Sequence, residues 1–133
     1  MARTLCILGC GTMGRAILGG LIASGESEGW SLVATVRHAD SARRLAEALP
    51  AVRVTTDNVE AARSADVVIL GVKPQAACGV LTAPGVPEAL EGSLLVSICA
   101  GVTLDQLARW VPGARVVRAM PNTPALIREG MTV

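Results

Sequence analysis

Short apolar runs, separated by turn-rich or amphipathic segments, recur along the whole chain. Most of these runs are continuous rather than alternating, which is typical of strands covered on both faces in a parallel sheet. Six strands are predicted in this way, at residues 4–8, 32–36, 52–55, 67–72, 94–98 and 115–118, and the run at 52–55 is the weakest of them.

The segments between the runs carry helix signals. Apolar residues recur at helical spacing over 13–23, and Gly25 follows as a stop signal. Further helices are indicated by side chains that accept hydrogen bonds from helix amides, namely Asp40 or Ser41, Asp57 or Asn58, and Thr103. Because parallel strands need crossover connections, this alternation predicts a doubly wound, mostly parallel α/β sheet of the Rossmann type. The expected strand order is 3-2-1-4-5-6, in one dinucleotide-binding domain over residues 1–133.

Composition narrows the classes of function. Hydrophobic residues make up 51% of the chain and charged residues 17%, and the net charge is +1. Such a chain buries a core, and it offers neither the basic field nor, with two Trp and no Phe or Tyr, the aromatic platform of a nucleic-acid binder. No apolar run approaches the roughly eighteen residues of a membrane span. We therefore expect a cytoplasmic protein without nucleic-acid or membrane partners.

The four cysteines do not form a metal-binding pattern. None of them belongs to a CxxC pair, and His38 is the only histidine, so we expect no metal site. Cys6 and Cys99 lie inside apolar runs, where cysteine behaves as a small hydrophobic residue. Free structural thiols indicate a reducing compartment.

The strongest local motif is a GxGxxG fingerprint that directly follows the first predicted strand and opens a helix. Its residues are Gly9, Cys10, Gly11, Thr12, Met13 and Gly14. The first glycine permits a tight turn, the second lets the backbone approach a pyrophosphate, and the third lets the helix press on the strand. The alternative is an ordinary strand-to-helix turn without a ligand.

The end of the second predicted strand indicates which dinucleotide binds. NAD sites place an acidic residue there to accept a hydrogen bond from the ribose 2′-hydroxyl, whereas this chain has Arg37 followed by His38. A guanidinium can grip the 2′-phosphate of NADP, and Arg43 and Arg44 follow on the next helix. NADP(H) is therefore expected as the preferred cofactor and NAD(H) as the alternative. The competing interpretation is that the arginines form a solvated basic face.

Three later segments also follow predicted strands, and the carboxyl ends of strands line the cofactor crevice in such sheets. Gly71, Val72, Lys73 and Pro74 follow the fourth strand, Cys99, Ala100 and Gly101 the fifth, and Asn122 and Thr123 lie in a proline-flanked loop after the sixth. Lys73, Asn122 and Thr123 are the candidates for a catalytic role near the nicotinamide. The alternative for Lys73 is a surface lysine that starts a helix. The alternative for Asn122 and Thr123 is an ordinary turn after a strand.

Several of these motifs occur together in a familiar order. They are Gly9-Cys10-Gly11-Thr12-Met13-Gly14, Thr56-Asp57-Asn58, Val72-Lys73-Pro74-Gln75, Ser97-Ile98-Cys99-Ala100-Gly101-Val102-Thr103, Met120-Pro121-Asn122-Thr123-Pro124 and Arg128-Glu129-Gly130-Met131-Thr132. In this series the chain resembles the N-terminal, cofactor-binding domain of the pyrroline-5-carboxylate reductase family. The resemblance covers essentially all 133 residues.

The resemblance implies an NAD(P)H-dependent oxidoreductase that reduces a small cyclic imine, 1-pyrroline-5-carboxylate, to L-proline in the last step of proline synthesis. It implies that residues from Leu8 to Met13 bind the pyrophosphate and that Arg37 lies at the adenosine ribose or its phosphate. It also implies that Asn58 lies near the adenosine end and that residues from Gly71 to Pro74 run along the cofactor. The residue at position 37 varies within the family, so the NADP preference rests on charge alone.

Members of the family continue into an all-helical C-terminal domain that forms the dimer and supplies most substrate-binding groups. The chain ends at Val133, so we expect the N-terminal half of a longer, homo-oligomeric two-domain reductase, incomplete as an enzyme by itself. A second hypothesis is a stand-alone NADP(H)-binding module that catalyses nothing. A reductase of another cyclic imine is a third, and a β-hydroxy-acid enzyme or a methyltransferase fits the motifs less well.

Overall fold

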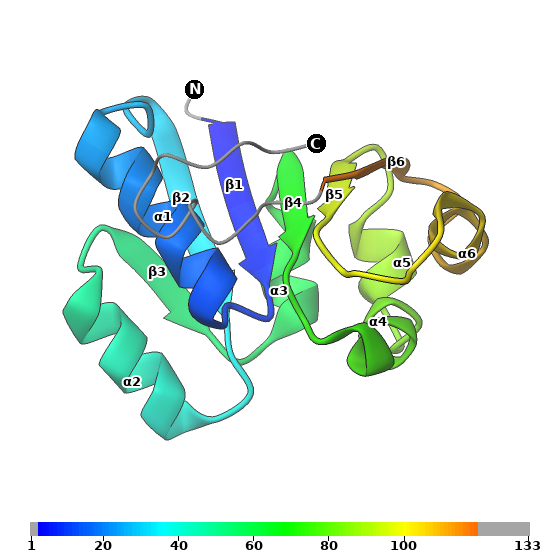
Figure 1. The fold of residues 1–133 in the computed structure, drawn as a ribbon, viewed down its shortest axis with the longest axis horizontal. Helices are drawn as coiled ribbons and strands as arrows, with labels where there is room; N and C mark the ends of the chain where they lie inside the picture. Colours follow the sequence, from blue (N-terminus) through cyan, green and yellow to red (C-terminus); the bar gives the residue numbers. More distant parts are fainter. Residues whose placement is uncertain (1–2, 120–133) are drawn as a thin grey trace.

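Residues 3–119, the part of the chain that the computed structural model describes, form six strands and six helices, with one helix or, in one case, two helices between successive strands (Figure 1). The strands are β1 (Arg3–Leu8), β2 (Trp30–Thr35), β3 (Val52–Thr55), β4 (Val67–Leu70), β5 (Leu94–Ser97) and β6 (Arg115–Arg118). The helices are α1 (Thr12–Ser24), α2 (Ala39–Ala48), α3 (Asn58–Arg63), α4 (Pro74–Leu81), α5 (Val86–Ala89) and α6 (Leu104–Trp110).

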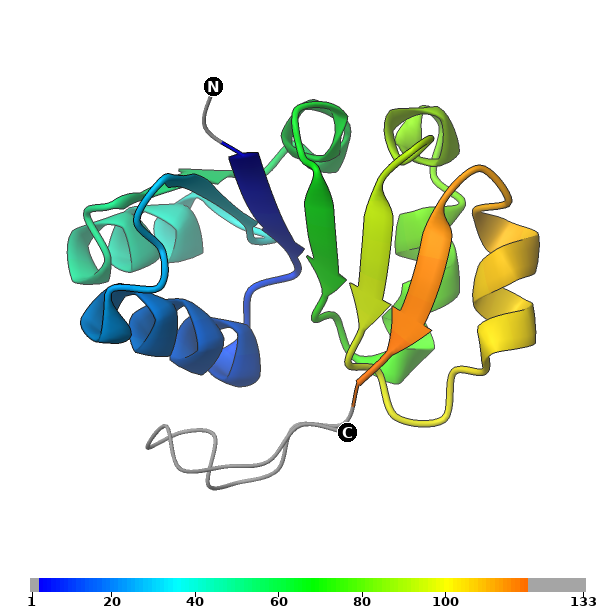
Figure 2. The same ribbon diagram turned by 90° about the horizontal axis from the view of Figure 1, so that it is seen from above.

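The six strands form one sheet in which every neighbouring pair is parallel. Their order is β3-β2-β1-β4-β5-β6, which confirms the predicted fold class and topology. Figure 2 shows the arrows of β1, β4, β5 and β6 all running the same way. Because β1 lies between β2 and β4, the chain departs from it in opposite directions, and this reversal places a crevice at the carboxyl end of β1.

Alternate residues of the strands face two separate layers of helices. Cys6 and Leu8 of β1 pack into the core formed with α3, α4, α5 and α6. Leu5 and Ile7 point the other way, into the core formed with α1 and α2. The two layers bury β1 from Leu5 to Leu8, which explains why this part of its sequence is a continuous apolar run.

The helix termini test the predicted caps. Asp57 caps α3 by accepting hydrogen bonds from two helix amides, and Thr103 forms a capping box with Gln106 at the start of α6, so both predictions are confirmed. Gly25 ends α1 in the left-handed conformation, as predicted. The prediction that Asp40 or Ser41 caps α2 is wrong. That helix begins earlier, at Ala39, because His38 already has the extended backbone of an N-cap.

Three predicted strands end earlier in the structure, at Thr35, Leu70 and Ser97 instead of at residues 36, 72 and 98. These early turns matter for the site, since Val36 and Gly71 then belong to loops at the sheet edge. The segment 82–92, for which no helix was predicted, contains the short helix α5. Across residues 3–119, every helix is too short or too polar to span a membrane.

Candidate functional site

A pocket with a volume of about 820 Å³ opens at the carboxyl edge of the sheet, where β1, β2, β3 and β4 end. This volume is within the range of small-molecule sites, roughly 300–1,000 Å³. Sixteen residues line the pocket: Gly9, Cys10, Gly11, Thr35, Val36, Arg37, Ser41, Thr56, Asn58, Gly71, Val72, Lys73, Gln75, Ala76, Gly79 and Val80. The pocket therefore lies where the doubly wound topology predicts a ligand crevice.

The glycine turn after β1 fits tightly against the loop after β4. Gly9 has a φ of +75°, and a Cβ at this position would overlap Cγ1 of Val72. A Cβ on Gly71 would lie 3.0 Å from the carbonyl oxygen of Gly9. Position 9 therefore needs glycine both for its positive φ and because a side chain would not fit. Position 71 needs glycine because a side chain would not fit.

The second and third glycines of the motif differ in their surroundings. A Cβ on Gly11 would meet nothing within 4 Å, so this residue leaves the approach to the backbone open. Gly14 is buried, and a Cβ there would lie 3.1 Å from Cγ2 of Ile7, so its lack of a side chain brings α1 close to β1. The first intrahelical hydrogen bond of α1 joins the Arg15 amide to the Gly11 carbonyl at 2.9 Å. The earlier amides of this turn therefore have no acceptor within the helix and offer donors to an anion.

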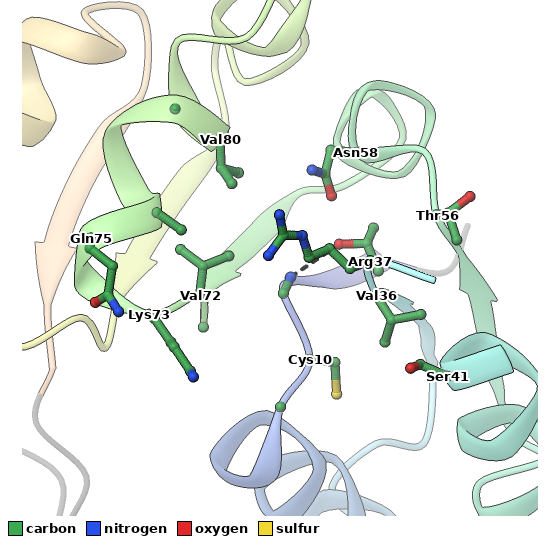
Figure 3. Close-up of a pocket in the computed structure, with 16 residues that line it drawn as sticks. Cys10, Val36, Arg37, Ser41, Thr56, Asn58, Val72, Lys73, Gln75 and Val80 are labelled. Atoms are coloured by element: carbon green, nitrogen blue, oxygen red, sulfur yellow. Dashed lines mark hydrogen bonds between the residues drawn. The ribbon is translucent and has the colours of Figure 1, made fainter. Parts of the chain in front are cut away.

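Two cations, Arg37 and Lys73, are among the lining residues, and that set contains no Asp or Glu. Figure 3 shows Arg37 extending into the pocket near Asn58, with Thr56 and Ser41 on the same side. All four residues come from the ends of β2 and β3 and the helices that follow. The pocket thus presents a positive side chain together with hydroxyl and amide groups, which suits an anionic ligand.

The other basic residues near β2 lie outside the lining. Arg43 pairs with Asp40 at 3.0 Å on the exposed face of α2, and both side chains are at least 70% exposed. Arg44 and His38 are also exposed. Of the three arginines that the sequence singled out, the structure brings only Arg37 to the pocket.

The opposite wall is formed by α4 and the loop before it. Lys73 is the N-cap of α4 and Pro74 its first residue, so Lys73 both starts a helix and lines the pocket. Gln75, Ala76, Gly79 and Val80 continue this wall along α4. Sequence reasoning did not identify these four residues as part of a site. Their spacing of three and four residues is the signal that one helix face is exposed to a shared space.

Three predicted residues after β5 do not line the pocket. Cys99 is only 2% exposed, and its Sγ donates a hydrogen bond to the Val72 carbonyl at 3.1 Å. It therefore supports the loop after β4 from the buried side. Ala100 and Gly101 are exposed beyond the lining. Leu8 is fully buried, and Thr12, Met13, Gly14 and Pro74 border the site without lining the cavity. Asn122 and Thr123 lie outside the described residues.

Burial keeps the thiols near the site protonated. Burial raises the pKa of Cys10 to about 11, against the opposing effect of Arg15, and it raises the pKa of Cys6 to about 12. Burial also raises the pKa of Cys99, with the Ser97 hydrogen bond acting in the opposite sense. At neutral pH these groups are thiols rather than thiolates, so they are poor nucleophiles. Within residues 3–119, no cluster of three or more His, Cys, Asp or Glu side chains is arranged to hold a metal.

The parallel sheet, its strand order and the glycine turn at the point where the order reverses define a Rossmann-type α/β domain. A family model described as NADP oxidoreductase, coenzyme F420-dependent, matches residues 4–101. The chain belongs to this family.

Individual relatives agree with the resemblance seen in the motifs. Pyrroline-5-carboxylate reductases from Lophium arboricola and Escherichia coli K12 are 40% and 42% identical, over 98% and 99% of this chain but 51% and 49% of their own length. Among solved structures, a pyrroline-5-carboxylate reductase from Coxiella burnetii superposes with a TM-score of 0.86 at 34% identity, covering 99% of this chain and 48% of that one. The Plasmodium falciparum enzyme, solved with NADP bound, gives a TM-score of 0.79 at 28% identity, covering 98% of this chain and 46% of its own. The chain thus spans about half the length of these relatives.

Proposed function

We propose that this chain binds NADPH and forms the cofactor half of a two-domain reductase that converts 1-pyrroline-5-carboxylate to L-proline. The observation that carries the proposal is the pocket itself. A glycine turn with its neighbouring helix amides lies at the reversal point of the sheet, and the lining contains Arg37 and Lys73 without any carboxylate. The relatives that carry the name pyrroline-5-carboxylate reductase support the choice of reaction.

The residues present fit a dinucleotide phosphate. The open space at Gly11 and the unengaged first-turn amides of α1 suit a pyrophosphate. Arg37 would bind a ribose 2′-phosphate, and this role is supported by its position in the lining, with the hydroxyl groups of Ser41 and Thr56 on the same side of the pocket. A carboxylate in place of Arg37 would favour NAD instead. Asn58 would contact the adenosine end.

Residues from Gly71 to Lys73 form the other end of the cofactor path. When bound, the reduced nicotinamide would supply a hydride to the imine carbon of the pyrroline, whose nitrogen is already protonated in solution, so that the product is the secondary amine. The chain's own task is to hold the cofactor in position and to keep water away from it. We assign Lys73 to orienting the cofactor, because it borders the pocket at the start of α4.

The substrate half of the site is proposed to come from a second structural unit, in a homo-oligomeric full-length enzyme of the cytoplasm. Two observations support a further packing surface. The chain spans about half the length of its relatives, and two large apolar side chains, Leu104 and Val117, are 48% and 46% exposed. The free thiols of all four cysteines agree with a reducing compartment.

The experiment that tests the cofactor assignment compares Arg37→Asp with Arg44→Asp. Both substitutions reverse one exposed charge near β2, but only Arg37 lines the pocket. We expect Arg37→Asp to weaken NADPH binding roughly 10- to 150-fold, the value of one lost charge-assisted contact, and to leave NADH binding nearly unchanged. Arg44→Asp serves as the matched control and is expected to change NADPH affinity less than about threefold. Equal effects of the two substitutions would contradict the assignment of the 2′-phosphate to Arg37.

A second candidate function is NADP(H) binding without catalysis. It is favoured by one observation, that Cys99, Ala100 and Gly101 do not line the described pocket. One assay tests this second candidate, by following NADPH absorbance with the purified chain in the presence and absence of pyrroline-5-carboxylate. Substrate-dependent oxidation would exclude a module that only binds NADP(H), whereas binding without oxidation is expected both of that module and of a cofactor half that lacks its substrate half.

A further inference from the structure

Thr35, the last residue of β2, contacts the glycine turn that follows β1. It is only 1% exposed. The Gly9 amide donates a hydrogen bond to the Thr35 hydroxyl oxygen Oγ1 at 3.0 Å, and the Cys10 amide donates to the Thr35 carbonyl at 2.7 Å. Two consecutive amides of the turn are thus bound by one residue of the neighbouring strand.

The turn is restrained on its other side by the loop after β4. The Gly71 amide donates to the Leu8 carbonyl at 2.8 Å, and the space beside Gly9 is filled by Val72. Thr35 and Val72 therefore hold the turn between two strands. The backbone contacts of this arrangement are independent of residue type, but the bond from Gly9 to Oγ1 requires a hydroxyl at position 35.

We propose that Thr35 is a positioning residue that fixes the glycine turn in its phosphate-binding conformation before the cofactor arrives. The inference rests on the proposed NADPH binding. Because Thr35 engages the amides of Gly9 and Cys10, the donors that face an incoming phosphate are the next ones, at the start of α1, above all Thr12 and Met13. Preorganised donors bind an anion more tightly than donors that must first be ordered.

The substitution Thr35→Val isolates the hydroxyl, because valine has nearly the same shape. It leaves the Gly9 amide without its acceptor at a largely enclosed position, and the turn then loses the bond that selects its conformation. Thr35→Ser keeps the hydroxyl and removes a methyl group. A role in positioning predicts that serine rescues binding, whereas a role in packing alone predicts that valine is the better substitute.

The matched control is Ser93→Ala. Ser93 is also buried, and its hydroxyl donates to the Ala65 carbonyl at 3.1 Å. It lies just before β5, at the amino-terminal ends of the strands, whereas the pocket lies at their carboxyl ends. We expect Thr35→Val to raise the Kd for NADPH about fivefold or more, and Thr35→Ser to stay within about twofold of wild type. Ser93→Ala is expected to lower the melting temperature without changing the Kd. A wild-type Kd for Thr35→Val would overturn the proposal.

Amide hydrogen exchange of the wild-type chain without cofactor tests the same proposal independently of any substitution. We expect the Gly9 and Cys10 amides to be protected already, and the Thr12 and Met13 amides to exchange quickly. Fast exchange at Gly9 in the cofactor-free chain would overturn the role of Thr35. A failure of the proposed function is distinguishable, because it appears as an absence of NADPH binding by the wild-type chain while Gly9 stays protected.

Discussion

Gly9 combines two constraints that no other residue type meets, a positive φ and direct contact with Val72. Gly9→Ala is therefore expected to lower the free energy of unfolding by about 2 kcal/mol or more and to abolish tight NADPH binding. Gly19→Ala is the matched control, because Gly19 lies inside α1 with open space around it. There, alanine is expected to raise the free energy of unfolding by about 0.5–1 kcal/mol. Urea unfolding and NADPH titration of both variants measure the contrast, and a tolerated Gly9→Ala would contradict the tight turn.

The buried thiol of Cys6 makes stability depend on alkaline pH. Burial raises its pKa to about 12 in the folded state, whereas an unfolded chain releases the proton near 9. The protonated Cys6 thiol therefore makes its full contribution to the free energy of unfolding below about pH 9. This contribution is lost as the pH rises toward 12. The chain has no tyrosine, and the raised pKa values of Cys10 and Cys99 act equally in a variant that lacks only the Cys6 thiol.

Urea unfolding at pH 8 and pH 10.5 measures this effect. The wild-type chain is expected to lose about 2 kcal/mol more than Cys6→Ala between the two pH values, because only the wild type has this buried thiol. Parallel losses in the two proteins would show that Cys6 ionises as readily in the folded state as in the unfolded one.

Some site residues were predictable and others were not, for a physical reason. The roles of Gly9 and Gly14 follow from backbone geometry that recurs wherever a strand meets a helix in this way. The prediction that Arg37 belongs to the binding site rests on its charge, which can be read directly from the sequence. Thr35 could not be predicted as a site residue, because its role depends on a hydrogen bond with a turn 26 residues away in the sequence. Nothing in the sequence around a threonine at the end of a strand indicates such a partner.

At the scale of elements, two helix caps separate stability from function. Asp57 accepts hydrogen bonds from Val59 and Glu60 at the start of α3, and its neighbours Thr56 and Asn58 line the pocket. Thr103 caps α6, which supplies none of the sixteen lining residues. Both Asp57→Ala and Thr103→Ala are expected to cost about 1 kcal/mol of stability. Only Asp57→Ala should also weaken NADPH binding. Thermal melts measure the loss of stability, and cofactor titrations measure the affinity for NADPH. Weaker NADPH binding by Thr103→Ala would contradict the location of the site.

The elements also show where sequence patterns reach their limit. The presence and order of the strands were predictable because each is a short, doubly covered apolar run. Their ends were less so. Apolar residues such as Val36 and Val72 look like strand residues, but in the structure they lie in loops that line the pocket. The start of α2 at Ala39 was missed because His38 adopts the cap conformation without any side-chain hydrogen bond.

For the whole molecule, the reversal of strand order at β1 accounts for the location of the site. Loops after β1, β2, β3 and β4 converge there, so residues from position 9 to position 80 share one pocket. The other end of the sheet, around β5 and β6, contributes none of the lining residues. This division agrees with a cofactor half that works with a second structural unit.

Calorimetric titration of the wild-type chain with NADPH and, separately, with NADH is the most direct test of the proposed cofactor site. We predict one NADPH site per chain and tighter binding of NADPH than of NADH, because the proposed partner of Arg37 is the 2′-phosphate that NADH lacks. No binding of either nucleotide, or equal affinity for the two, would contradict this prediction.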